Sequence, residues 1–357
     1  MKIEELNTQS YSLNHISICF SELTEIKRQM IMKKLFRVGN KVMIDETTLI
    51  VLFDSFELEK QINRWDDPNE KAQLQQILNR QKIVWSGAHF NFDLTNQPIV
   101  YTIMNITPDS FHDGAQENLN VDSFLKKVEN QLIDGASVIE LGGKSSRPGY
   151  LDITPNQEWL RLEKPLKALK KQFPDVTVAI DTDEPEVMER VLDCGVDIIN
   201  DIDGFDTDEK LKVIEQYRPS VVAMNNGRTP FLYSDDVFEE LSGFYEHKKQ
   251  ELLHTGLKKE QICTDPGVGF YDPNRGGDSL ERAKSSELLS RFGLPVMIAI
   301  SHKRFLSQDF GFSDQDRGFG NLMLEAQMIA DGGRVLRVHD TKDTKLLIDG
   351  FKKYKQA

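Results

Sequence analysis

Cysteine is scarce in this chain, and the sequence has no long apolar run. Only 3 cysteines occur among the 357 residues, with no C-x-x-C pair, so neither a disulfide framework nor a zinc knuckle is expected. No stretch approaches the roughly 18 consecutive apolar residues of a membrane helix, and the acidic start MKIEELNTQS does not resemble a signal peptide. We therefore predict a cytoplasmic protein with buried or idle thiols.

Positive charge is also in short supply. The 57 Asp and Glu outnumber the 44 Lys and Arg, which gives a formal net charge of −13. This balance excludes nucleic acid or an anionic membrane as the general partner, but it leaves room for a small anionic substrate in a local basic pocket. The apolar content, 39%, is that of a globular protein with one large core, or with a large and a small one.

Eight short apolar runs follow residue 98, each bounded by Gly, Pro, Asn or Asp. They are IVYTIMNI, VIELGG, VTVAIDT, DIINDI, SVVAMN, ICTDPG, PVMIAIS and VLRVHD. The segments between them have helical spacing, and one helix is predicted to begin with Thr154 as N-cap and Pro155 at its first position. Eight alternating units in about 260 residues match an α/β (β/α)8 TIM barrel. We predict this barrel over residues 96–357; an open doubly wound sheet is the alternative.

The segment before the barrel has a different pattern. Its strand-like VMIDETTLIVLF lies between helix-like SELTEIKRQMIMKKL and ELEKQINRWDDPNEKAQLQQILNRQK. We predict a small α+β domain over residues 1–95 that packs on the barrel or helps it to dimerise. It contains no catalytic signature.

Polar, charged or glycine residues end all eight predicted strands. Because the active site of such a barrel lies at the C-terminal ends of its strands, we expect these residues at one rim. Carboxylates and amides suit the N–H edge of a flat heterocycle, since a carboxylate accepts two adjacent donors. These residues are Asp181, Asn200 and Asp265. Cations suit a phosphate or diphosphate. These residues are Arg147, Lys303, Arg337 and His339.

Seven motifs occur in order, each at a predicted strand end. They are NITPDSFHDG, GASVIELGGKSSRPG, VAIDT, DIINDIDG, DPGVGF, SHKRFL and RVHD. Over roughly residues 98–350 they resemble the dihydropteroate synthase family, and the N-terminal segment resembles the extension of its longer members. The resemblance implies a homodimeric, Mg²⁺-dependent transferase of folate biosynthesis. Its reaction joins 6-hydroxymethyl-7,8-dihydropterin diphosphate to p-aminobenzoate and releases diphosphate.

The resemblance also implies roles for individual residues. The implied pterin site comprises Asp181, Asn200, Asp265 and Lys303, with Met224 aligned with the Met that stacks on the pterin. The implied diphosphate site comprises Asn105, Arg337 and His339, and Asn105 is also the implied Mg²⁺ ligand. The implied p-aminobenzoate site comprises Ser146, Arg147, Pro148, Phe270 and Ser301. Asp113 resembles the residue that helps to close the first loop; with Arg147 and Lys303 it completes the predicted catalytic set.

The chain departs from the family's usual motifs at several positions. Lys144 and Ser146 stand for Glu and Thr, His302 stands for Arg, Tyr271-Asp272-Pro273 follows DPGVGF where Gly-Lys is usual, and no clean His-Met pair ends VVAMNN. These changes leave open a diverged pterin-binding paralogue without catalysis, acting as a regulatory or binding partner. A pterin-binding methyltransferase is a third hypothesis, but it has no need for the S-R-P and S-x-K sequences present here.

Overall fold

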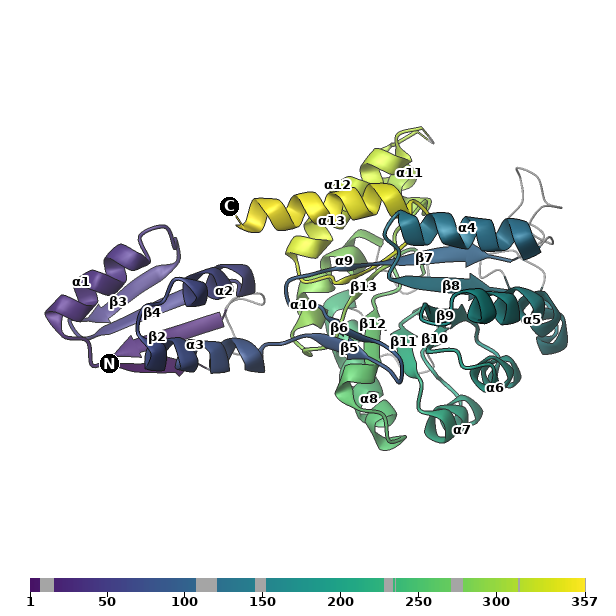
Figure 1. The fold of residues 1–357 in the computed structure, drawn as a ribbon, viewed down its shortest axis with the longest axis horizontal. Helices are drawn as coiled ribbons and strands as arrows, with labels where there is room; N and C mark the ends of the chain where they lie inside the picture. The colour runs from purple at the N-terminus through teal and green to yellow at the C-terminus, as the bar shows by residue number, and fades with distance from the viewer. Residues whose placement is uncertain are drawn as a thin grey trace. The chain divides into compact units, whose positions relative to one another are not determined.

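The structure is a computed structural model that describes residues 1–6, 16–106, 121–144, 152–227, 234, 236–270, 279–313 and 315–356. The chain forms two compact units (Figure 1). Unit 1 comprises Met1–Ile83 and Gly350–Ala357, and unit 2 comprises Val84–Asp349. None of the helices among the described residues combines the length and the apolar character that a membrane crossing requires.

Unit 1 contains a four-stranded antiparallel sheet in the order β1-β2-β4-β3. Its strands are β1 (Lys2–Glu5), β2 (Ile16–Ser21), β3 (Lys41–Asp45) and β4 (Thr48–Phe53). Its helices are α1 (Glu25–Lys34), α2 (Ser55–Asn63) and α3 (Pro68–Arg80). Alternate residues of the two central strands, such as Ile18 and Val51, pack with helix residues such as Ile31 and Leu74 to form the core of this unit.

The N-terminal segment has more elements than its apolar pattern predicts. The strand-like VMIDETTLIVLF forms two strands, β3 and β4, joined by a turn in which Asp45 accepts a hydrogen bond from the Thr47 backbone N at 2.7 Å. The following helix-like stretch forms two helices. Asp67 caps the second helix by accepting from the Glu70 backbone N at 3.0 Å, and Pro68 occupies its first turn. Turn and cap chemistry therefore sets these boundaries.

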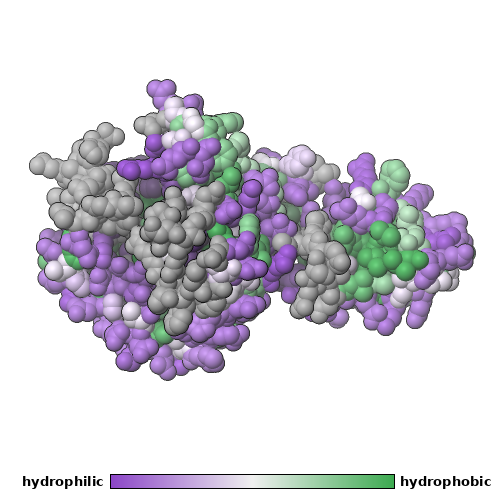
Figure 2. Space-filling view, turned by 180° about the vertical axis from the view of Figure 1, so that it is seen from behind, coloured by the Kyte–Doolittle hydropathy of each residue, from purple (hydrophilic) through white to green (hydrophobic). Residues whose placement is uncertain are grey.

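One face of the unit 1 sheet is apolar and exposed. Val42 and Ile44 on β3 are 60% and 59% exposed. Ile50 and Leu52 on the adjacent β4 are half-buried, while the residues that alternate with them are in the core. Figure 2 shows a gathering of hydrophobic side chains on this unit. The described part of unit 1 thus leaves an apolar sheet face in contact with solvent.

Unit 2 is a (β/α)8 barrel, as predicted. Eight parallel strands lie in the order β12-β11-β10-β9-β8-β7-β14-β13, and a bridge between Thr264 and Val296 joins the two ends of the sheet. Each apolar run of the sequence supplies one strand. The strands are β7 (Ile99–Asn105), β8 (Val138–Gly142), β9 (Thr177–Asp181), β10 (Ile198–Asp201), β11 (Ser220–Met224), β12 (Ile262–Asp265), β13 (Met297–Ile298) and β14 (Val335–Val338). The closed order excludes the open doubly wound sheet.

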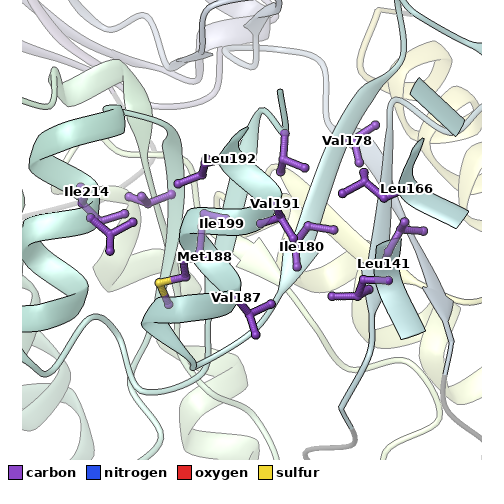
Figure 3. Close-up of a cluster of buried hydrophobic side chains, with 14 of the residues drawn as sticks. Leu141, Leu166, Val178, Ile180, Val187, Met188, Val191, Leu192, Ile199 and Ile214 are labelled. Carbon is purple, nitrogen blue, oxygen red and sulfur yellow. The ribbon is translucent and has the colours of Figure 1, made fainter. Parts of the chain in front are cut away.

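Helices pack around the barrel. They are α4 (Val121–Ile133), α5 (Pro155–Gln172), α6 (Pro185–Asp193), α7 (Asp208–Tyr217), α8 (Val237–His254), α9 (Ser279–Lys284), α10 (Ser286–Ser290), α11 (Phe305–Phe310), α12 (Arg317–Ala330) and α13 (Thr341–Gln356), with a 3-10 turn at Lys259–Gln261. Helix α5 begins as predicted, with Thr154 as N-cap and Pro155 in its first turn. Apolar residues such as Ile180 on β9 and Val191 on α6 fill the space between strands and helices (Figure 3).

A short hairpin, β5 (Val84–Ser86) and β6 (Asn91–Asp93), lies at the N-terminal end of the barrel. The Ser220 hydroxyl at the start of β11 donates to the last carbonyl of β5 at 2.7 Å, and His89 Nδ1 lies 3.0 Å from the Asp197 carboxylate just before β10. Trp85 is fully buried and stacks on Tyr101 of β7. The compact units therefore divide before this hairpin, whereas the boundary expected from the sequence, at residue 95, lies after it.

Candidate active site

The predicted site residues that the structure describes lie at one end of the barrel. Strand ends carry Asn105, Asp181, Asn200, Met224, Asp265 and Arg337, and the loops directly after strands carry Phe270, Ser301, Lys303 and His339. Asp113, Ser146, Arg147, Pro148 and the Tyr271-Asp272-Pro273 sequence lie outside the described residues. The described set reaches this rim from β7, β9, β10, β11, β12 and β14, and from the loops after β12, β13 and β14.

A buried carboxylate, Glu140 on β8, accepts hydrogen bonds from residues of three other strands, β7, β10 and β14. Arg337 donates to Glu140 Oε1 from Nε at 2.8 Å and from Nη2 at 2.5 Å. The Tyr101 hydroxyl and Asn200 Nδ2 each donate to Glu140 Oε2 at 2.8 Å. Arg337 Nη2 also donates to Asp181 Oδ2 at 2.6 Å. The network therefore connects three predicted site residues from the ring-binding and anion-binding groups.

Sequence reasoning missed Glu140, which lies inside VIELGG. The signal that points to it is a carboxylate at the centre of an apolar strand, because a buried charge persists only with partners. Burial also changes the pKa of Asp181, which shares Arg337 with Glu140. Burial raises the pKa of Asp181 to about 7, although the positive charge of Arg337 opposes this shift. The site thus contains a carboxyl group that titrates near neutral pH.

Lys303 is a second cation of this rim and lies in the loop after β13, the neighbour of the strand that carries Arg337. Its Nζ lies 4.5 Å from the centroid of the Phe270 ring and donates to the Val268 carbonyl. Burial lowers the pKa of Lys303 to about 8, and the charge of Asp265 opposes this shift. Burial likewise raises the pKa of Asp265, whose Oδ1 accepts from the Gly267 backbone N at 2.8 Å. The rim therefore holds a lysine whose charge is lost only slightly above neutral pH.

Ser301 and His339 contact each other across the adjacent ends of β13 and β14. Ser301 Oγ lies 3.0 Å from His339 Nδ1 and accepts from the His339 backbone N at 3.2 Å. His302 Nε2 lies 2.7 Å from Asp340 Oδ2, and its ring centroid is 5.5 Å from that of His339. The hydrogen bond to Asp340 raises the pKa of His302. His302, which departs from the family motif, thus lies beside His339, a predicted anion-binding residue.

Asn105 ends β7 directly opposite Gly142 of β8. A Cβ atom at position 142 would lie 3.2 Å from Asn105 Oδ1, so the glycine leaves space for this side chain. The described residues contain no group of three or more His, Cys, Asp or Glu side chains arranged for a metal ion. Mg²⁺ commonly takes one or two protein oxygens and fills its shell with substrate phosphates and water. A single amide oxygen at the rim fits that kind of site.

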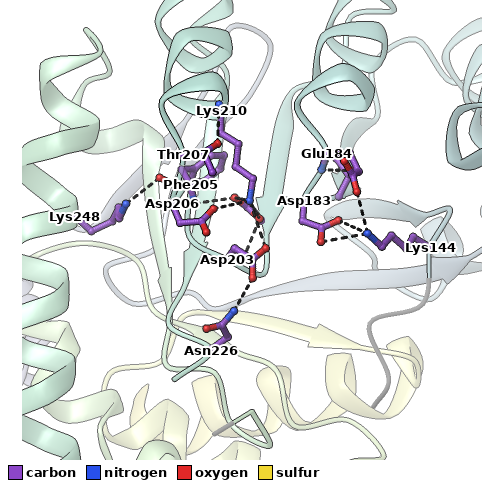
Figure 4. A network of polar contacts seen from close by, with 12 residues as sticks. Lys144, Asp183, Glu184, Asp203, Phe205, Asp206, Thr207, Lys210, Asn226 and Lys248 are labelled. Carbon is purple, nitrogen blue, oxygen red and sulfur yellow. Dashed lines mark hydrogen bonds and ion pairs between the residues drawn. The ribbon is translucent and has the colours of Figure 1, made fainter. Parts of the chain in front are cut away.

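Lys144, which reverses the charge usual at its position, is surrounded by carboxylates. Its Nζ lies 3.0 Å from Asp152, 3.0 Å from Asp183 and 3.1 Å from Glu184. Figure 4 shows the last two, which follow β9, converging on the lysine. Although burial alone lowers the pKa of Lys144, hydrogen bonds and charge from these carboxylates raise it overall. The charge reversal is therefore compensated within the structure.

A second ion-pair cluster supports the loop after β10 (Figure 4). The buried ammonium of Lys210 lies 3.1 Å from Asp201, 3.4 Å from Asp203 and 2.8 Å from Asp206. Asn226, after β11, donates to Asp203 at 2.6 Å. Burial raises the pKa of Asp201 to about 6, opposed by the Lys210 charge. This cluster fixes the backbone directly beyond Asn200 and is a structural support for the rim.

Met224 is buried at the end of β11, where the strand register pairs it with Asp265 of β12. Gly204, with φ of +66°, lies so close that a Cβ there would be 2.6 Å from the Met224 carbonyl oxygen. The loop after β10 therefore packs tightly against the end of β11. The role of Met224 in stacking on a pterin stays a prediction.

Comparison with known proteins places this site in a family. The sequence profile described as "Pterin binding enzyme" matches residues 101–339. The dihydropteroate synthase of Streptococcus pyogenes is 30% identical over 260 residues, which cover 72% of this chain and 96% of that protein. The chain belongs to the dihydropteroate synthase family. The Escherichia coli K12 dihydropteroate synthase is also 30% identical, over 265 residues that cover 71% of this chain and 90% of its own length.

Solved structures of the dihydropteroate synthase family superimpose on this chain. A Yersinia pestis dihydropteroate synthase in a sulfonamide drug complex has a TM-score of 0.69 at 26% identity, and covers 77% of this chain and 100% of its own. A Clostridium difficile dihydropteroate synthase with pteroic acid has a TM-score of 0.67 at 28% identity, covering 74% and 100%. The resemblance inferred from seven motifs is thus confirmed, and residues 1–100 precede the range that the family profile matches.

Proposed function

We propose that this protein is a dihydropteroate synthase, a transferase that joins 6-hydroxymethyl-7,8-dihydropterin diphosphate to p-aminobenzoate and releases diphosphate. The observation that carries the proposal is the contact of 2.6 Å between Arg337 and Asp181. It links a carboxylate suited to a heterocycle with a cation suited to a diphosphate. The substrate joins those two chemical groups through one methylene carbon, so their binding sites must be neighbours.

The ring-binding half of the site consists of carboxylates, an amide and a lysine. We assign the pterin ring to Asp181, Asn200, Asp265 and Lys303, with Met224 against its face. Carboxylates accept the ring N–H groups, and the lysine donates to a ring acceptor. Asn200 and Asp265 are buried, and Asp181 and Lys303 are half-buried. Such positions strengthen the hydrogen bonds because water is largely excluded.

The anion-binding half consists of Asn105, Arg337 and His339. In this assignment the two basic side chains bind diphosphate oxygens, and Asn105 Oδ1 is the protein ligand of Mg²⁺. When bound, Mg²⁺ supplies positive charge that stabilises diphosphate as a leaving group. The p-aminobenzoate site is assigned to Phe270 and Ser301 of the described residues, together with Ser146, Arg147 and Pro148. Asp113 is assigned to closure of the first loop.

The reaction exchanges one bond to the pterin methylene carbon for another. The C–O bond breaks, and its electron pair leaves with diphosphate; the resulting cation is delocalised into the pterin. The amine of p-aminobenzoate forms the new C–N bond and loses one proton to solvent. Arg337 and His339 stabilise the charge that develops on the leaving oxygen, and the ring-binding carboxylates orient the carbon toward the amine. No protein nucleophile is required, and the sequence contains no G-x-S-x-G.

The assignment is tested by diphosphate release from the purified full chain with Mg²⁺ and the pterin diphosphate, with and without p-aminobenzoate. We expect release that depends on p-aminobenzoate and that falls by at least about 100-fold in Lys303→Ala, in line with loss of a charged contact in a catalytic site. Lys212→Ala, which removes an exposed lysine from α7, is the matched control and should keep wild-type activity. Asn105→Ala should require more Mg²⁺ for half-maximal rate.

Two outcomes contradict the proposal. Tight binding of the pterin without release of diphosphate indicates the non-catalytic paralogue considered above. Release that does not depend on p-aminobenzoate indicates hydrolysis. The homodimer and the cytoplasmic location stay predictions; sedimentation of the full chain tests the first, and fractionation of cells tests the second.

A further inference from the structure

Arg337 is shared between two carboxylates of unequal character. Its Nη2 donates to Glu140 at 2.5 Å and to Asp181 at 2.6 Å, while Nε donates to Glu140 at 2.8 Å. One guanidinium charge thus faces two carboxyl groups. An anion that approaches Arg337 in this arrangement meets a cation whose charge is already neutralised.

The two carboxylates differ in how firmly they are held. The Glu140 side chain is 1% exposed, and its second oxygen accepts from Tyr101 and Asn200 at 2.8 Å each. All of the acceptor positions of this carboxylate are therefore in use. The Asp181 side chain is 20% exposed and lies at the end of β9. Glu140 is the fixed partner of Arg337, and Asp181 is the exchangeable one.

We propose that Glu140 is a positioning residue that couples the two halves of the site through Arg337. When the pterin ring donates its N–H groups to Asp181, Arg337 gives up that contact and keeps Glu140. One guanidinium N–H then becomes available to diphosphate, from a position that Glu140 fixes. This inference rests on the proposed function, since it assigns the ring to Asp181 and the anion to Arg337.

The exchange makes the two halves of the substrate help each other to bind. Thermodynamic linkage makes this effect reciprocal. If bound pterin increases the affinity of the protein for diphosphate, bound diphosphate increases the affinity for pterin by the same factor. The environment of Asp181 agrees with a contact that can be given up, because burial raises its pKa to about 7 even with Arg337 beside it. A free diphosphate product also leaves more readily once the ring has departed.

Calorimetric titration of the full chain with two fragments tests the inference. The fragments are 6-hydroxymethylpterin, which has no diphosphate, and inorganic diphosphate with Mg²⁺. We expect each fragment to raise the affinity for the other by about tenfold, within the usual range of coupling between sites. If both fragments bind and neither alters the other, the inference is wrong and the proposed function stands. If neither fragment binds, both are wrong.

Two substitutions then examine the role of Glu140. Glu140→Gln cannot accept from Arg337, Tyr101 and Asn200 at once, because an amide has one acceptor oxygen; we expect the coupling to fall to about twofold or less. Tyr101→Phe removes one hydrogen bond and keeps the carboxylate, so most of the coupling should remain. Full coupling in Glu140→Gln would overturn its positioning role. The titration of the wild-type chain shows whether the two fragments are coupled, and this result does not depend on whether a variant folds.

Discussion

Lys144 and Asp183 form an ion pair across the ends of β8 and β9, with 3.0 Å between Nζ and Oδ1. We expect Lys144→Glu to place like charges together and to lower the free energy of unfolding by about 1 kcal/mol. Position 144 directly precedes the segment that carries Arg147, so the KM for p-aminobenzoate should rise about fivefold while that for the pterin diphosphate changes little. Steady-state kinetics and urea unfolding measure these effects.

The matched test is a charge swap. Lys144→Glu combined with Asp183→Lys restores opposite charges at the same two positions. Because Asp152 and Glu184 still face position 144, we expect it to recover part of the stability and of the KM. A double variant that is no better than Lys144→Glu alone would show that the ion pair does not matter to the loop. Lys164→Glu, at an exposed position on α5, controls for the change in net charge.

The pH dependence of kcat/KM for the pterin diphosphate follows from two shifted groups. Asp181 must lose its proton to accept ring N–H groups, so activity should rise as pH increases through about 7. Lys303 must keep its proton to donate, so activity should fall as pH increases through about 8. The expected profile is a narrow bell. In Lys303→Arg the alkaline limb should disappear while the acid limb stays, and a flat wild-type profile from pH 6 to 9 would contradict both assignments.

His302 and Asp340 should make stability depend on pH. The pKa of His302 is raised by its hydrogen bond to Asp340, so its contribution is fully present below the unfolded value near 6.5 and is lost as pH rises through the folded value. Asp340 has a lowered pKa for the same reason, and its contribution is lost as pH falls through that value. His302→Gln should therefore lower Tm most between about pH 5 and 6.5, with a difference that narrows toward pH 8.5. A difference in Tm that is constant with pH would refute the ion pair.

Trp85 should be important for stability although it is not one of the predicted site residues. It is fully buried against Phe90 and Tyr101 at the N-terminal end of the barrel. Trp85→Ala should cost about 3–5 kcal/mol in the free energy of unfolding, with kcat almost unchanged at low temperature. Trp159→Ala, at a half-buried position on α5, should cost less. A loss below about 1 kcal/mol for Trp85 would mean that the hairpin does not belong to the barrel core.

Apolar runs and strand-end residues were sufficient to predict the barrel, because each strand is short, buried and bounded by turn formers. The rim set followed from one geometric rule, that parallel strands bring their C-terminal ends together. Contacts such as Ser301 with His339 come from strands that are sequential in the chain, and they agree with that rule. The start of α5 could also be predicted, because Thr154 as N-cap and Pro155 in the first turn are local signals of a helix N-terminus.

Other features depend on information that the linear pattern contains only weakly. Glu140 was missed because its charge lies in the middle of a strand rather than at an end, and because its partners come from three different strands. The compensation of Lys144 involves residues 39 and 40 positions away. The hairpin at Trp85 joins the barrel through aromatic packing, which no local pattern specifies. In each case tertiary contacts decide the outcome.

The single bridge between Thr264 and Val296 has a further consequence. Every other pair of neighbouring strands in the eight-stranded sheet is paired at two or more residue positions, whereas β12 and β13 are joined at this one bridge. Fewer backbone hydrogen bonds must break to separate them, so amide protons along this seam should exchange with deuterium sooner than those elsewhere in the barrel. Asp265 is the last residue of β12, and Ser301 lies in the loop after β13. A ligand that contacts both residues would slow that exchange. The exchange rate along the seam would therefore show whether a ligand is bound at the rim.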